Sequence, residues 1–126
     1  MIAHISIGVR DIERSKRFYD AVLEPLGYKC LRSARSLVGY GYGRDHIAFW
    51  VVQAERPVPA DEKSGLHFCF AAPEAAAVNT FHAAALRAGG RNNGAPGLRP
   101  RLLRCLHHRS RRIPHRSILR SRRDLK

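Results

Sequence analysis

The sequence HISIGVRDIERSKRFYDAVLEPLGY, residues 4–28, recurs in weakened form as HFCFAAPEAAAVNTFHAAALRAGG, residues 67–90. A shift of 63 positions aligns the two stretches. The aligned pairs are His4 with His67, Asp11 with Glu74, Phe18 with Phe81, Leu23 with Leu86 and Gly27 with Gly90. Because 63 residues are too many for one unit of a solenoid, the repeat predicts two copies of one supersecondary module.

Each copy begins with a strand and continues with a helix. In residues 1–9 the apolar side chains alternate with His4 and Ser6, so the histidine lies on the face opposite the apolar one. Residues 66–71 repeat this alternation with His67. Asp11 is a good N-cap for a helix over residues 12–26, and the second helix starts at residues 73–74, where proline is tolerated. Gly27 and the glycines at 89–90 end the two helices.

Three further strands are predicted in the first copy, at residues 28–32, 37–42 and 46–52, separated by glycine-rich turns. The chain thus divides into a β-α-β-β-β module at 1–53, a linker at 54–64, a second module at 65–100 and a tail at 101–126. Residues 92–97 are loop-forming, and the tail has no strand alternation and too many arginines for a core. The second module is therefore incomplete after about residue 100.

The net charge of +13 is concentrated in the tail. Residues 100–126 hold 10 Lys/Arg and one Asp, whereas residues 1–99 hold 13 Lys/Arg and 9 Asp/Glu. The tail contains no aromatic residue that could stack on bases, which argues against nucleic acid as the partner. Three cysteines without a CxxC pair indicate unpaired thiols, with Cys30 and Cys69 expected in apolar surroundings. No apolar run suits a membrane span or a signal peptide, so a cytoplasmic location is expected.

Residues 4–28 and 65–100 resemble the vicinal oxygen chelate superfamily, which includes glyoxalases, extradiol dioxygenases, and fosfomycin-resistance and bleomycin-binding proteins. The resemblance covers residues 1–100. It implies an α+β fold in which two β-α-β-β-β modules curl into a cup-shaped half-barrel sheet within a single domain. It also implies a homodimer, and a metal site on the inner face of the cup.

The same resemblance implies that His4 and His67, at equivalent first-strand positions, ligate a divalent metal such as Zn, Fe, Mn or Ni. The family's further ligand, a glutamate after a DPDG-like turn in the last strand, has no counterpart here. Two histidines alone would hold a metal weakly, and many members of the superfamily carry none. No catalytic residue can be assigned.

Aromatic residues near the strand at 46–52 have two interpretations. Trp50, Phe49, Tyr40 and Tyr42 either line an apolar ligand pocket in the cup or belong to the core, and Trp50 is the one we expect to face a substrate. The other histidines have simpler roles. His46 belongs to a turn, His82 to a helix surface, and the tail group around Cys105 and His107 lacks the spacing of a metal site.

The tail also has an interpretation at the level of the genetic code. One permitted codon string for residues 101–117, read one base later, encodes DYYAAFITDPDGYRIEA. This peptide contains the missing strand, the DPDG turn and the glutamate. We therefore hypothesise that residues from about 101 onward are translated in a shifted frame.

Two functions follow from the resemblance. The first is a metal-dependent enzyme, of lyase, isomerase, dioxygenase or thiol-transferase type, which polarises two neighbouring oxygens of a small substrate. The second is a metal-free module that sequesters a small hydrophobic or drug-like molecule. Since one scaffold carries unrelated chemistries, the fold does not choose between them.

Overall fold

Four strands of the first module form one sheet in the order β1-β4-β3-β2. The computed structural model describes residues 1–57, 68–90, 92 and 103–104 of the chain. The strands are β1 (Ile5–Val9), β2 (Lys29–Ala34), β3 (Leu37–Tyr42) and β4 (His46–Gln53). β1 runs parallel to β4, and the other neighbours are antiparallel. The predicted α+β fold class and the β-α-β-β-β order of this module are confirmed.

The strand boundaries differ from the predicted ones by a few residues. β3 has the predicted limits, but β2 continues to Ala34 because a turn of only two residues lets Ala34 pair with Leu37. β1 starts at Ile5, where its pairing with Phe49 begins, so His4 immediately precedes the strand.

The first helix, α1 (Ile12–Leu23), starts as predicted. The Asp11 side chain caps it by accepting a hydrogen bond from the Arg14 backbone N–H at 2.9 Å. The predicted last turn is a 3-10 helix, η1 (Glu24–Leu26). Pro25 accounts for this difference, because its missing N–H cannot continue the α-helical hydrogen bonds. Gly27 then ends the helix with a φ of 83°, as its position predicted.

The second copy repeats this beginning in β5 (Cys69–Phe70) and α2 (Ala75–Arg87). A shift of 63 residues places the first residue of α1 on the first residue of α2, and Gly89 ends α2 with a φ of 93°. β5 pairs with β6 (Leu103–Arg104), so the prediction that the tail contains no strand is wrong for these two residues. A pairing this short needs only backbone groups, which side-chain alternation does not reveal. The rest of the tail, and residues 58–64 of the predicted linker, lie outside the described residues.

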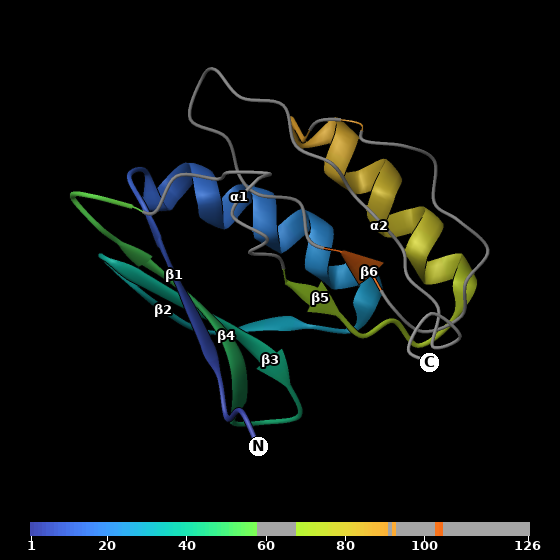
Figure 1. Ribbon diagram of the computed structural model, residues 1–126, viewed down its shortest axis with the longest axis horizontal. Helices are drawn as coiled ribbons and strands as arrows, with labels where there is room; N and C mark the ends of the chain where they lie inside the picture. Colours follow the sequence, from blue (N-terminus) through green and yellow to red (C-terminus); the bar gives the residue numbers. More distant parts are fainter. Residues whose placement is uncertain (58–67, 91, 93–102, 105–126) are drawn as a thin grey trace, which may run out of the picture.

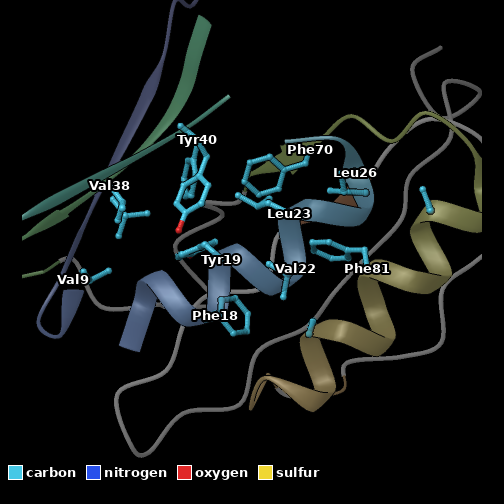
Figure 2. Packing of buried hydrophobic residues seen from close by; sticks show 14 of the residues in the cluster. Val9, Phe18, Tyr19, Val22, Leu23, Leu26, Val38, Tyr40, Phe70 and Phe81 are labelled. Carbon is cyan, nitrogen blue, oxygen red and sulfur yellow. The ribbon is translucent and has the colours of Figure 1, made fainter. Parts of the chain in front are cut away.

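Both helices lie on the same side of the sheet, with α1 against the strands and α2 beyond it (Figure 1). The core fills the space between α1 and the strands, and α2 adds Phe81 to it (Figure 2). Its largest fully buried side chains are Tyr19, Tyr40, Leu23, Val22, Val38 and Val51. Phe18 and Phe81, which are equivalent in the repeat, are 4% and 3% exposed. Equivalent faces of the two helices are thus buried.

Two expectations about single residues fail. Cys30 and Cys69 are both exposed and not buried. Cys30 stands on β2, an edge strand whose residues are nearly all exposed, so the apolar neighbours in the sequence do not enclose it.

No helix among the described residues is long and apolar enough to cross a membrane.

Candidate functional site

The side of the sheet that faces away from α1 and α2 is called the helix-free face below (Figure 1). On β3, Val38 and Tyr40 are each 1% exposed and point into the core beneath α1 (Figure 2). Successive residues of a strand point to opposite faces, so Leu37, Gly39 and Gly41 belong to the helix-free face. The same rule assigns Trp50 and Val52 to this face, because Phe49 and Val51 are buried in the core.

A row of four residues crosses the sheet on this face. Trp50 of β4 is paired with Ser6 of β1 on one side and with Gly39 of β3 on the other, and Gly39 is paired with Arg32 of β2. Directly paired residues share a face, and neighbouring strands lie about 4.8 Å apart. The four residues, called the Trp50 row, therefore present in order a hydroxyl, an indole, a glycine without a side chain, and a guanidinium.

The indole of Trp50 lies over Gly39. A Cβ atom built at Gly39 would stand 2.7 Å from Cζ3 of Trp50 and 2.9 Å from Cγ2 of Ile47. Both side chains thus use the space that a side chain at position 39 would fill. Trp50 and Ile47 remain partly exposed, as do Leu37 and Val52, which are paired beside them. The centre of the helix-free face is consequently apolar and incompletely buried.

The chain after β4 borders this apolar centre at one end. A Cβ atom at Gly8, which follows Ser6 on the same face, would stand 2.9 Å from Cβ of Ala54 and 3.6 Å from Cα of Pro57. The segment from Ala54 to Pro57 therefore crosses β1, and a small residue is needed at position 8 for it to do so.

The aromatic candidates separate into two groups. Trp50 lies on the helix-free face, and the expectation that it faces a substrate stays a prediction. Tyr40 and Phe49 belong to the core, with 1% and 3% exposure, so the second of the two interpretations holds for them. The exposed Tyr42 ring packs against Tyr28 and His46, with ring centroids 6.3 and 4.5 Å away. Neighbouring residues of β3 and β4 point to opposite faces of the sheet, so a difference of one position decides whether an aromatic side chain lies in the core.

Only one of the two predicted metal ligands, His4, lies within the described residues. His4 is exposed and precedes β1, and an extension of the strand alternation puts it on the side of Ser6. His67 lies outside the described residues. Within the described ranges, no three side chains of His, Cys, Asp or Glu come together as a metal site. Of the two predicted ligands the described residues include only His4, and one imidazole does not by itself hold a metal ion.

A polar network lies on the opposite side of the sheet, beneath α1. The Tyr40 hydroxyl donates to Asp20 Oδ1 at 2.9 Å and approaches the Lys16 carbonyl at 3.2 Å, and Lys16 Nζ lies 2.6 Å from Asp20 Oδ2. Burial and the Asp20 carboxylate raise the pKa of Tyr40 far above its ordinary value, and the hydrogen bond to Asp20 raises the pKa of Lys16. Lys16 and Asp20 are four positions apart on α1, but Tyr40 is 24 and 20 positions away from them, so local sequence patterns do not reveal its place in the network.

The two remaining histidines of the described chain, His46 and His82, contact Tyr42 and Asn92. His46 begins β4 and stacks near Tyr42, in agreement with a turn-proximal role. His82 is partly buried on α2, and its Nε2 lies 3.3 Å from Oδ1 of Asn92. This contact joins the side chain of Asn92 to α2.

Comparison with known proteins identifies a relative among the solved structures. No protein-family model matches the sequence, and no curated protein does so. The crystal structure of a glyoxalase/bleomycin resistance protein from Albidiferax ferrireducens is 33% identical in sequence to this chain. The match covers 71% of each of the two chains, with a TM-score of 0.59.

Proposed function

This chain belongs to the glyoxalase/bleomycin resistance family of the vicinal oxygen chelate superfamily, and from that premise we propose that it binds a small apolar or aromatic molecule on the helix-free face, at Trp50. The observation that carries the proposal is the position of the indole, which lies over Gly39 on a sheet face that neither described helix covers.

The physical driving force is the surface that this face leaves incompletely buried. Trp50, Ile47, Leu37 and Val52 are all only partly buried. A ligand that covers them gains roughly 25 cal/mol for each Å² of apolar surface removed from water. An aromatic ligand would also gain about 0.5–1.5 kcal/mol from stacking on the indole. Ser6, on the strand beside Trp50, provides a hydroxyl that can orient a polar group.

The intrinsic fluorescence of Trp50 tests this proposal directly, because Trp50 is the only tryptophan in the chain. Naphthoate, naphthylmethanol and bleomycin are suitable probes, the last because the solved relative is described as a bleomycin resistance protein. We expect saturable quenching by at least one of them. Calorimetry should show at least tenfold weaker binding in Trp50→Ala and a smaller loss in Trp50→Phe, which keeps an aromatic ring.

The outcome that contradicts the proposal is equally direct. If a probe binds the purified protein with the same affinity in the wild type and in Trp50→Ala, its site is elsewhere. Tyr42→Ala is the matched control, since Tyr42 is an exposed aromatic residue on β3 that packs with Tyr28 and His46, apart from the Trp50 row. This variant should leave the affinity within about twofold of the wild type.

A metal-dependent lyase, isomerase or dioxygenase activity is the second candidate. It is favoured by His4, which strand alternation puts on the same side of the sheet as Trp50. The proposed ligands are His4 and His67, around a divalent metal. Elemental analysis of protein purified without chelator should find stoichiometric metal that is lost in His4→Ala and retained in His46→Ala. Metal that persists in His4→Ala, or no metal in the wild type, argues against this candidate.

A further inference from the structure

We propose that the ligand of the helix-free face is a planar aromatic carboxylate, which stacks on Trp50 and directs its carboxylate to Arg32. This inference rests on the proposed function and adds the chemical class of the ligand. It is carried by the order of the Trp50 row, in which an aromatic surface and a cation are separated by one glycine.

Arg32 reaches this face through an irregularity of β2. The register shifts between Cys30 and Arg32, so that Cys30 is opposite Tyr40 while Arg32 is opposite Gly39. Without the shift, Cys30 and Arg32 would lie on the same face, because they are two residues apart. The bulge at Leu31 moves Arg32 to the face of Gly39 and Trp50.

The charges of the sheet favour an anion here. None of the four strands contains an aspartate or glutamate. β2 contributes Arg32 and also Lys29, which is paired with Gly41 and so belongs to the helix-free face. Within the described residues the only ion pair joins Lys16 to Asp20, and the Arg32 guanidinium has neither a carboxylate nor a ring partner. An aromatic carboxylate would supply a carboxylate for Arg32 and a ring that stacks on Trp50.

The spacing also suits such a ligand. Trp50 and Arg32 are two strands apart, which separates their Cα atoms by about 10 Å before the long side chains shorten the distance. Gly39 places no side chain between them. A ring resting on the indole can therefore extend over β3 towards β2, where the guanidinium can bind a carboxylate through two parallel hydrogen bonds.

The test compares naphthoate with naphthylmethanol, a neutral analogue of similar shape, by titration calorimetry. We expect naphthoate to bind the wild type about tenfold or more tightly than the alcohol, as an added charged hydrogen bond implies. Arg32→Gln should abolish this preference and leave the affinity for the alcohol within about twofold. Arg35→Gln, which removes the same charge at the turn between β2 and β3, is the matched control and should keep the preference.

The possible failures are distinguishable. Equal affinity for both compounds in the wild type, or a preference that survives in Arg32→Gln, overturns the assignment of an aromatic carboxylate and leaves the Trp50 site intact. Binding of neither compound to the wild type likewise overturns the aromatic carboxylate, whereas binding of both compounds with undiminished affinity in Trp50→Ala overturns the proposed site itself. Added salt provides a second readout, because a preference that depends on Arg32 should decrease as ionic strength rises.

Discussion

At the scale of single residues, Gly39 and Trp50 depend on each other. The indole occupies space that any side chain at position 39 would enter, since a Cβ atom there would stand 2.7 Å from Cζ3 of Trp50. The clashing atom belongs to the end of a side chain and not to the backbone, so the ring can rotate away from Gly39. The glycine therefore sets the position of the indole more than the stability of the sheet.

Gly39→Ala should displace the indole and weaken ligand binding. We expect a red shift of the Trp50 emission maximum, at least a fivefold loss of affinity for the aromatic probe, and a destabilisation of only about 1 kcal/mol, because the ring can rotate away. Emission spectra, calorimetry and urea unfolding measure these effects. An unchanged emission maximum together with unchanged affinity would refute the placement of the indole over Gly39.

Tyr40 contributes to stability through the Asp20 hydrogen bond, and this contribution depends on pH. Its pKa is raised in the folded protein above the ordinary value of 10.0, so the folded state keeps a proton that the unfolded state releases. The resulting stability is complete below pH 10.0 and decreases as the pH rises above that value.

Tyr40→Phe should cost about 1–3 kcal/mol at neutral pH, because Asp20 and the Lys16 carbonyl lose a donor. The difference in unfolding free energy between wild type and variant should shrink above about pH 10. Urea unfolding at several pH values measures it. A difference that stays constant from neutral to strongly alkaline pH would count against the buried hydrogen bond.

Strand alternation in the sequence suffices to place Trp50 on a face of the sheet, but it does not place Arg32. Alternation along β4 is regular around Trp50, so its face could be deduced once Phe49 was known to be buried. Arg32 could not be placed, because the bulge in β2 reverses the face that simple alternation assigns to it. A bulge depends on pairing with a second strand, and the sequence of one strand does not contain that information.

At the scale of elements, the two helices show how much of a duplicated module the sequence encodes. Asp11 and Gly27 marked the limits of the first helix correctly because caps act locally. The 3-10 turn also has a local cause, Pro25, which the periodicity of apolar residues does not register. The strand pairing in β5 and β6 has no local cause and was missed.

Gly27→Ala should destabilise the protein by about 1 kcal/mol, because Gly27 adopts a φ of 83° that disfavours other L-residues. Among the described residues, chain neighbours aside, no atom lies within 4 Å of a Cβ built at this position, so the cost is conformational and not steric. Gly27→Asn is the matched control and should recover part of the loss, since asparagine tolerates this conformation. Equal unfolding free energies for the wild type and Gly27→Ala would contradict the assignment.

At the scale of the whole molecule, the sequence repeat predicted the α+β class and the strand-helix beginning of each module. Both follow from alternation and helical periodicity, which are local signals. The last part of the second module could not be predicted, because residues 101–126 lack either signal. The match to the solved relative covers 71% of the chain.

The hypothesis of a shifted frame makes a prediction about the gene and another about the protein. Codons 101–117 should encode DYYAAFITDPDGYRIEA when read one base later, and the nucleotide sequence decides this. A chain carrying that peptide in place of residues 101–117 should melt at a higher temperature, by roughly 4–8 °C for each kcal/mol that the restored strand contributes. Codons that do not permit the peptide, or a lower melting temperature for the altered chain, would contradict the hypothesis.

The central claim is that the helix-free face around Trp50 is the ligand site of this family member. The nuclear magnetic resonance signal of the Trp50 indole N–H, the only indole in the chain, tests it most directly during a titration with naphthoate. We expect a saturable shift of that signal, accompanied by shifts of β3 and β4 amides, while the amides of α2 stay in place. An indole signal that does not move while α2 amides shift would contradict it.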